Sequence, residues 1–473
     1  MLKSKLKHSI QWGLLPTVFA LAWPTMLEQL MQTAVQYIDT AMVGSLGTHA
    51  TAAVGSTSTV NWLIGSTISA VGVGFLAYIS QSLGAGERFK AAKASAQAVL
   101  AVIVSGLFFT VVTLLLSPFV PLWMQVDPEI QDLASQYFFI LYTPMLARAA
   151  TIIFGTVLRA AGDTKTPMKI GVWVNVINIV LNFLLIYPSR HVTVFGMKIF
   201  VPGMGWEVIG AAVASAVSFA VGGILITVRL WQHPTLSPKG HSVMPDWNVL
   251  RPCLRIAIPN GLQRFATSLG YVAFAAMINS LGDIATAAHT IANTVESAFY
   301  IPGYGMQTAA ATLAGNTLGA KDNKRIQELS RMILLIEILL MIISGGLLFA
   351  FAPNMMTLFT TDTQVILLGA TVLRMVAVSE PFYGVSIIIE GMMQGMGKTV
   401  MPFVSNVIGM WGIRIVGTFI CTQVWQMDLV SAWACMILHN LMLFVVFLFY
   451  YLSGRWNPMN NPAKDSKNTE NSY

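Results

Sequence analysis

Long apolar runs recur along almost the whole chain and are separated by short connections that contain charged residues, glycine or proline. Each run has about 20 residues or more, the length that a helix needs to cross a hydrocarbon layer about 30 Å thick. The runs are continuous and do not alternate between apolar and polar residues, so they predict helices rather than the strands of a membrane barrel. We expect twelve helices, over residues 14–44, 51–82, 92–119, 130–158, 166–188, 208–231, 250–279, 285–317, 327–352, 364–395, 401–424 and 429–452.

The composition supports this interpretation. Of the 473 residues, 55% are hydrophobic and only 10% are charged, whereas a soluble domain has roughly 25% charged residues. A chain with so little charge does not have the composition of a water-soluble domain. The predicted class is therefore an all-α polytopic membrane protein.

The basic residues crowd alternate connections, and the formal net charge is +7. The other connections hold only Arg190 and Lys198 as basic residues, and otherwise carry acids such as Asp127, Asp283 and Asp428. Lys and Arg accumulate in cytoplasmic loops, so we expect both termini in the cytoplasm, and the positive charge does not indicate a nucleic-acid partner. The basic residues of these connections are Lys3, Lys5, Lys7, Arg88, Lys90, Lys93, Arg159, Lys165, Lys169, Arg229, Lys239, Arg251, Lys321, Lys324, Arg325 and Lys398.

An internal repeat relates the two halves of the chain. The segment SLGTHATAA at residues 45–53 returns as SLGDIATAA at residues 280–288, 235 positions later. Each half has six predicted helices, so both halves enter the membrane in the same orientation, as parallel repeats of a secondary transporter do, with a substrate cavity expected between them. The predicted domains are an N-lobe (1–231), a cytoplasmic linker (232–247), a C-lobe (248–452) and a polar cytoplasmic tail (453–473). The Pro, Gly and Ser content of the linker suits a mobile connection.

Three segments resemble one transporter family. AWPTMLEQLMQTAVQYIDTAMVG is similar to the first helix of the multidrug and toxic compound extrusion (MATE) family, LRAAGDTKTPM to its fourth-to-fifth helix region, and ATAAHTIANTVESAFYIPGYGMQTAAATLAGNTLGAKD to its eighth helix. The resemblance covers about residues 12–452. It implies a bacterial efflux antiporter that exchanges organic, often cationic, compounds for H⁺ or Na⁺.

The resemblance also implies where the coupling acid lies. The N-lobe acid of the first helix corresponds to Asp39. Many members also carry an acid in helix seven, but this chain has none between Pro259 and Asn279 and offers Gln263 and Arg264 instead. The hypothesis for coupling therefore rests on the N-lobe.

Asp39 lies six residues before Ser45, or about 9 Å along a helix, so it is expected in the outer half of the membrane. Asn175, Asn178 and Asn182 fall on one face of the fifth helix, which should point inward because amides are costly in lipid. The family resemblance favours a network of Asn178 and Asn182 with Asp39, and we expect these side chains, together with Asn175, to form the cation-coupling site. Its carboxyl can exchange a proton or, when ionised, hold Na⁺ together with amide oxygens. The alternatives are an interfacial Asp39 that caps the next turn, and asparagines that only join helices.

Glu296 aligns with Asn61 in the repeat and lies near the membrane midplane, where it would line a substrate cavity or pair with Arg264. Glu28 lies at the repeat position of Gln263 and has the same two interpretations. The segment YIPGYGM is expected to bend or unwind the eighth helix beside the cavity. The complete set of predicted cavity residues is Glu296, Asn61, Gln307, Glu28, Gln263 and Tyr304.

Two further acids lie in the tenth predicted helix. Glu380 is expected at mid-membrane, where Arg374 or Arg414 could neutralise it. Glu390 is close to the cytoplasmic end, so we expect an interfacial pair with Lys398 rather than a role in transport.

No enzyme signature is present in the sequence. The seven histidines are scattered without the spacing of a zinc site, and neither GAGE nor GMGK follows the pattern of a phosphate loop. We expect no enzymatic activity and no cofactor besides the coupling ion. The expected partners are small organic substrates and the lipid bilayer, and the protein should act as a monomer in the cytoplasmic membrane. A flippase for lipid-linked saccharides is the alternative transporter, and a membrane enzyme or scaffold is the alternative outside transport.

Overall fold

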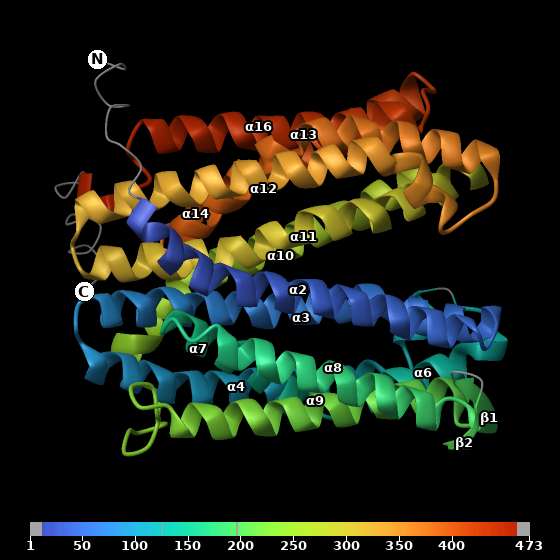
Figure 1. The fold of residues 1–473 in the computed structure, drawn as a ribbon, viewed down its shortest axis with the longest axis horizontal. Coiled ribbons are helices and arrows are strands. Elements are labelled where there is room, and N and C mark those ends of the chain that lie inside the picture. The colour runs from blue at the N-terminus through green and yellow to red at the C-terminus, as the bar shows by residue number, and fades with distance from the viewer. Residues whose placement is uncertain (1–11, 125, 195–196, 461–473) are drawn as a thin grey trace. The chain divides into compact units, whose positions relative to one another are not determined.

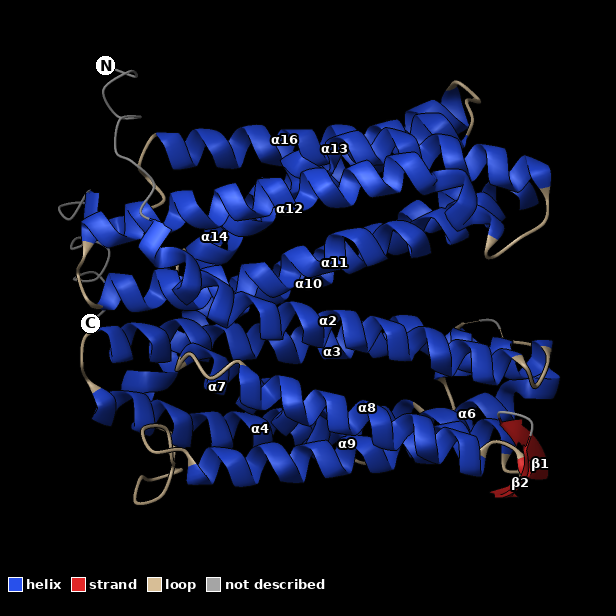
Figure 2. Ribbon diagram, in the orientation of Figure 1, coloured by secondary structure: helices blue, strands red, loops and turns tan. Residues whose placement is uncertain are grey.

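The computed structural model describes residues 12–124, 126–194 and 197–460. Within these ranges the chain is helical except for one antiparallel hairpin and the connecting loops (Figures 1 and 2). The elements of the first half are η1 (Trp12–Leu14), α2 (Leu15–Gly44), α3 (Thr48–Gly84), α4 (Arg88–Leu116), α5 (Val120–Trp123), α6 (Pro128–Tyr142), α7 (Met145–Ala160), α8 (Lys165–Leu185), β1 (Pro188–Val194), β2 (Met197–Met204) and α9 (Glu207–Gln232).

The second half repeats the pattern of long helices. Its elements are α10 (Trp247–Asn279), α11 (Asp283–Gly319), α12 (Asn323–Thr357), α13 (Thr363–Gly395), α14 (Val400–Val407), η2 (Ile408–Ile415), α15 (Val416–Phe419), η3 (Ile420–Val424), α16 (Leu429–Leu452) and η4 (Pro458–Asn460). The four elements from α14 to η3 follow one another without a gap, and η2 and η3 are π-helical.

Every one of the twelve predicted helices has a helical counterpart in the described ranges, but the fourth is broken. Residues 130–158 were expected as one helix, whereas α6 and α7 meet at a bend of 50°. Pro144 lies at the break and has no backbone N–H to donate, so the helical ladder cannot continue through it. The bent pair together corresponds to one predicted span.

Eight of the described helical segments are long and apolar enough to cross a membrane by themselves, and nine are if the bent pair counts as one. The helices α2, α10 and α11 are not among them. They carry polar side chains along their length, such as Arg264 in α10 and Glu296 in α11, which lower the mean hydropathy. Length and apolarity alone therefore undercount the helices that the repeat predicts.

The described residues form two compact units. One contains residues 28–75 and 88–251, and the other contains residues 12–27, 76–87 and 252–460. Thus the first part of α2 and the last part of α3 belong to the unit that holds the C-terminal helices. Two hydrogen bonds within that unit show this packing: Thr25 Oγ1 donates to the Gly305 carbonyl at 2.8 Å, and Gln81 Nε2 donates to the Gly395 carbonyl at 2.9 Å.

Small residues allow close helix packing in each unit. In the unit with the C-terminal helices, α13 packs against α11, α12 and α16 (Figure 1). A Cβ atom at Gly395 of α13 would lie 1.9 Å from the Ala311 carbonyl oxygen of α11, and one at Gly223 of α9 in the other unit would lie 2.5 Å from the Ala147 carbonyl oxygen. Packing of small residues backbone to backbone is a common way to join helices in a membrane.

The segment expected to be a mobile linker, residues 232–247, is docked on α4. Gln97 is fully buried, and its Nε2 donates to the Met244 carbonyl at 2.8 Å while its Oε1 accepts from the Asp246 N–H at 3.0 Å. Lys93, one turn earlier on α4, forms an ion pair with the Asp246 carboxylate. The composition of the segment permits a coil, but these contacts hold its second half in place.

Candidate functional site

Asp39 of α2 is half-buried and faces two buried amides of α8. Asn182 Nδ2 donates to Asp39 Oδ1 at 2.6 Å. The Asn178 amide satisfies its neighbours when its nitrogen faces Asp39: it then donates to Asp39 Oδ1 at 2.8 Å and accepts from Ser215 Oγ at 3.2 Å. The structure thus brings together three of the four residues expected at the coupling site.

The side chain of Asn175, the fourth residue, makes no hydrogen bond within the described part of the chain. It lies one turn before Asn178 on the same helix face, and it is only half-buried. Asn182 Oδ1, by contrast, is buried without a hydrogen-bond partner among the described residues. The site therefore presents a carboxylate, two amide donors and one unsatisfied acceptor oxygen.

Two predicted cavity residues of the same unit contact arginines instead of an open space. Arg159 Nη2 donates to Glu28 Oε1 at 2.5 Å, as an ion pair. Asn61 Oδ1 accepts from Arg148 Nη1 at 2.5 Å and from Tyr142 OH at 3.0 Å. Both side chains thus join helices within one unit.

Gln263 of α10, in the other unit, contacts Glu390 of α13. Gln263 Nε2 and Gln394 Nε2 donate to Glu390 Oε1 at 2.8 and 3.0 Å, and Asn406 Nδ2 donates to Oε2 at 3.3 Å. The expected pair of Glu390 with Lys398 is replaced by this set of amides, because Lys398 Nζ donates to the backbone carbonyl of Arg455. Glu390 is therefore a second carboxylate held by amides.

Three buried glutamates lie close enough to interact electrostatically in the same unit: Glu296 of α11, Glu337 of α12 and Glu380 of α13. Both carboxyl oxygens of Glu337 and both of Glu380 lack hydrogen-bond partners in the described ranges. Glycines make the space for Glu337, because a Cβ atom at Gly303 or Gly384 would lie 2.7 or 3.1 Å from its Oε1.

The expected neutralisation of Glu380 by an arginine is wrong. Arg374 Nε donates to the Phe349 carbonyl at 3.4 Å. The Arg414 guanidinium lies over the Phe274 ring, 4.2 Å from its centroid, and leaves the Glu380 oxygens without a partner. Arg414, rather than the predicted Arg264, is the cation that interacts electrostatically with Glu296.

Tyr304 and Gln307, the remaining predicted cavity residues, are packed within α11 and α13. The hydroxyls of Tyr304 and Tyr383 are 2.9 Å apart and share a hydrogen bond. Gln307 is 7% exposed and fills the space beside Gly391. The segment YIPGYGM does not unwind the helix, because α11 continues from Asp283 to Gly319 with Pro302 inside it.

Sequence reasoning missed Glu337 and the amide partners of Glu390. Glu337 interrupts the apolar stretch LLIEILL in the ninth predicted helix. A lone acid in such a stretch is itself a signal, because ionisable residues within membrane helices are rare and face protein or water. Of the amides around Glu390, Gln394 lies at i+4 on the same helix and could have been found from its spacing, whereas Gln263 and Asn406 come from other helices and could not.

The described residues hold no group of three or more His, Cys, Asp or Glu side chains that could bind a metal ion. A cation at Asp39 would therefore depend on amide oxygens for its other ligands. Hard cations such as Na⁺ accept carboxylate and amide oxygens. Asn182 Oδ1 has no partner among the described residues, but the Nδ2 of the same amide is the atom that contacts Asp39, so Oδ1 would serve as a ligand only after the amide turns over.

Comparison with known proteins places the chain in a family. The model of the MatE family matches residues 24–184 and 259–420, which together exceed half of the chain and fall on both repeats. Among curated relatives, the probable multidrug resistance protein NorM of Thermotoga maritima is 27% identical over 436 residues, which cover 92% of each chain. The probable multidrug resistance protein YpnP of Bacillus subtilis is 26% identical over 459 residues, covering 95% of this chain and 97% of the relative.

Solved structures agree on the fold. A multidrug resistance MATE family transporter of the MOP superfamily in an outward-facing conformation matches with a TM-score of 0.84 at 21% identity, and a MOP superfamily transporter from Pyrococcus furiosus matches with a TM-score of 0.83 at 22% identity. Each match covers 94% of this chain and 96% of the other. The protein is a multi-pass membrane protein with the twelve-helix fold of these transporters, and it belongs to the MatE family of efflux transporters.

Proposed function

We propose that the protein is a secondary active antiporter that exports organic compounds, often cationic, in exchange for H⁺ or Na⁺. The names of its relatives supply the substrate class, since several are described as multidrug resistance proteins. The observation that carries the coupling mechanism is the contact of the Asp39 carboxylate with the Asn182 and Asn178 amides. Both termini are proposed to be cytoplasmic, and the monomer is proposed as the functional unit.

The chemistry of coupling follows from the kinds of atoms at this site. The amide nitrogens donate to the ionised Asp39 carboxylate, but they carry no positive charge that would neutralise it. A proton on Asp39 would turn one carboxyl oxygen into a donor. Asn182 Oδ1, which has no partner among the described residues, could accept from it once the amide turns its oxygen toward Asp39. Na⁺ would instead bind the carboxylate and amide oxygens together. In both cases the bound cation removes the local charge.

The proline inside α2 offers a way to transmit this change. Pro24 lies inside α2, about four turns before Asp39, and supplies no backbone N–H to the helix. Residues of α2 up to Leu27 belong to one compact unit, and those from Glu28 belong to the other. Neutralising Asp39 would alter the contact of α2 with α8 in the part of α2 that follows Glu28. If α2 changes direction in response, Pro24 is a position where a helix bends readily.

The test is transport in proteoliposomes that contain the purified full-length chain. We expect Asp39→Asn to abolish uptake of a cationic dye driven by an imposed pH or Na⁺ gradient, because the amide cannot exchange a proton and provides no negative charge for Na⁺. Running the pH and Na⁺ gradients separately identifies the ion. Asp132→Asn, an exposed acid on α6, is the matched control and should transport normally.

Gradient-driven transport that persists in Asp39→Asn at wild-type protein level would overturn Asp39 as the coupling acid. The buried glutamates of the other unit are then the next candidates. Glu380→Gln and Glu337→Gln separate the two possibilities, since these variants should retain coupling if Asp39 carries it and lose coupling if the C-terminal cluster does.

The relatives favour efflux over the alternative of a flippase for lipid-linked saccharides. A flippase would leave the cellular accumulation of fluorescent cationic dyes unchanged, whereas an exporter lowers it. We expect expression of the protein to lower dye accumulation, and an unchanged level alongside active lipid translocation would reverse this choice.

A further inference from the structure

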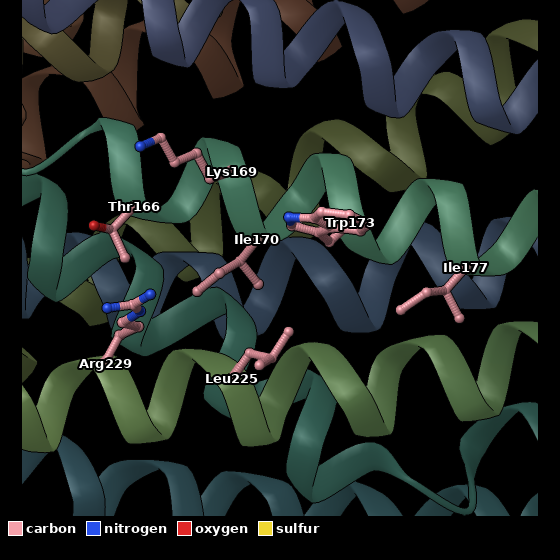
Figure 3. A pocket seen from close by; sticks show the side chains of 7 residues that line it. All are labelled: Thr166, Lys169, Ile170, Trp173, Ile177, Leu225 and Arg229. Atoms are coloured by element: carbon pink, nitrogen blue, oxygen red, sulfur yellow. The ribbon is translucent and has the colours of Figure 1, made fainter.

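A groove of about 490 Å³ lies between the first turns of α8 and the last turns of α9, within one compact unit. Figure 3 shows its lining from close by: Thr166, Lys169 and Arg229 lie toward one end, Ile177 lies toward the other, and Trp173 lies between them. The groove is separate from the Asp39 site, since neither Asp39 nor its amide partners line it. Its polar groups are thus gathered at one end.

The two cations of the groove have no acidic partner. Lys169 and Arg229 are exposed, and neither forms an ion pair within the described ranges. The neighbouring acid on the α7–α8 connection, Asp163, is engaged at the start of α8, where its Oδ1 accepts from the Thr166 N–H at 3.0 Å. Two unneutralised positive charges at the mouth of one groove favour an anion as its occupant.

The length of the groove along α8 suits an amphiphile rather than a small ion. Lys169 precedes Trp173 by four residues and Ile177 by eight, which corresponds to about 6 and 12 Å along the helix. Ile170 and Leu225 add apolar lining from the two helices. Tryptophan is enriched where a membrane protein meets the headgroup layer. Along the groove, the charged side chains at one end are therefore followed by the ring of Trp173 and then by aliphatic side chains.

The fold itself does not require these residues. The repeat offset of 235 places Val404 opposite Lys169 and Ile408 opposite Trp173 in the second half, and both are exposed apolar residues. The equivalent helix face in the second half is thus fully apolar at these two positions. An exposed lysine in the second turn of a membrane helix is consequently a property of the first half that packing does not explain.

We propose that this groove binds one anionic phospholipid of the inner leaflet. The phosphate lies between Lys169 and Arg229, within reach of the Thr166 hydroxyl, and an acyl chain follows Trp173 and Ile177. The loops that join at this end carry the positive charge that assigns them to the cytoplasm, and basic pockets between helices on that side are suited to lipid headgroups. The proposal goes beyond efflux and does not depend on the identity of the coupling ion or the substrate.

The experiment is native mass spectrometry of the delipidated full-length protein in detergent, titrated with phosphatidylglycerol or phosphatidylcholine. We expect one phosphatidylglycerol to bind in preference to phosphatidylcholine, and the double variant K169Q/R229Q to bind it at least roughly tenfold more weakly, since two basic contacts are removed. The charge-preserving variant K169R/R229K should retain the preference.

K165Q/K239Q is the matched control, because it removes two exposed lysines from the same connections without touching the groove. An equal loss in this control, or equal binding of phosphatidylcholine by the wild type, would overturn the proposal. So would displacement of the lipid by millimolar inorganic phosphate, which would make the site one for a free anion. Because the readout is lipid binding, failure here leaves the transport experiment unaffected.

Discussion

Glu28, Asp39 and Glu390 each accept hydrogen bonds from nitrogen donors, but the donors differ in charge. Glu28 contacts the Arg159 guanidinium, whereas Asp39 and Glu390 contact only amides in the bonds described above. A guanidinium neutralises its partner and keeps its proton at all accessible pH values. An amide orders a carboxylate without neutralising it. The charge at Glu28 is thus balanced by its partner, whereas the amide contacts described for Asp39 and Glu390 do not balance theirs.

This difference predicts distinct effects of removing each partner. Glu28→Gln replaces the carboxylate that contacts Arg159 by a neutral amide in a largely buried position, where the side-chain exposures of Glu28 and Arg159 are 10% and 17%. We expect a loss of about 3 kcal/mol in unfolding free energy, measured as a lower midpoint of thermal unfolding in detergent.

The double variant E28Q/R159Q removes both charges and should recover most of that stability. A double variant as unstable as the single one would mean that the pair contributes hydrogen-bond geometry rather than charge balance. Transport should follow stability in these variants, in contrast to Asp39→Asn, where stability is retained and coupling is lost.

The contacts of Asp39 with two amides agree with the sequence-based expectation, whereas its role in coupling stays a prediction. The spacing of Asn178 and Asn182 placed both amides on the face that meets Asp39. The spacing could not exclude Asn175, because Asn175 lies on the same helix face. That face extends over two turns, and a single aspartate reaches only part of it. The contacts of Glu390 with Gln263 and Asn406 depend on side chains from other helices, and that information is tertiary.

At the scale of elements, glycine decides how closely helices approach. Gly395 of α13 lies against the Ala311 carbonyl, and a Cβ atom there would be 1.9 Å from that oxygen. Gly346 of α12 has open space around its Cβ position. The same substitution should therefore have opposite signs at the two positions.

Gly395→Ala forces α13 away from α11 and should destabilise the protein by roughly 1–3 kcal/mol. Gly346→Ala should be neutral or stabilising by up to about 1 kcal/mol, because alanine favours the helix. Thermal unfolding of the two variants in the same detergent compares them. Equal stabilities of the two variants would show that α11 and α13 can move apart without a loss of unfolding free energy.

The sequence predicted the number of helical segments correctly, but it did not predict that the fourth is broken. Apolar runs, divided at charged, glycine and proline positions, predicted the twelve segments, because hydrogen bonding in lipid leaves few alternatives to a helix. Two prolines had different outcomes: Pro144 ends the ladder between α6 and α7, while Pro302 is accommodated inside α11. Which of these occurs depends on neighbouring helices that can support the freed carbonyls, so proline alone does not decide it.

At the scale of the whole molecule, the docked linker is the main departure from expectation. Prolines, glycine and serines indicated a coil, but Gln97 and Lys93 on α4 supply specific partners for it. Hydrogen bonds from a buried glutamine to backbone groups about 150 residues away leave no local trace in sequence. The predicted lobe boundaries at 231 and 248 remain a prediction.

The Lys93–Asp246 contact should respond to acid. The hydrogen bond from Lys93, followed by the N–H of Asn248, lowers the pKa of Asp246 from its ordinary value of 3.8. A carboxyl with a lowered pKa stabilises the docked state above that ordinary value, and this contribution is lost as the pH falls through the pKa in the docked state. A spin label at position 240 should therefore gain mobility as the pH falls below 3.8.

Lys93→Gln should raise the mobility of the same label already at pH 6 and weaken its response to acid. Arg88→Gln removes an exposed charge at the start of α4 and serves as the control. A label whose mobility is the same in wild type and Lys93→Gln at pH 6 would show that Gln97 alone holds the segment.

The docking of residues 242–246 has a consequence for dividing the protein into two chains. Gly240 lies just before the docked segment, in a left-handed conformation with a φ of 78° and open space around it. A break at this point would leave a second fragment whose leading peptide already fits the Gln97 and Lys93 surface of the first. Co-expressed halves divided at Gly240 should associate through the contacts of residues 242–246 with α4. A division after Asp246 would leave these residues on the first fragment, so they could not join the two.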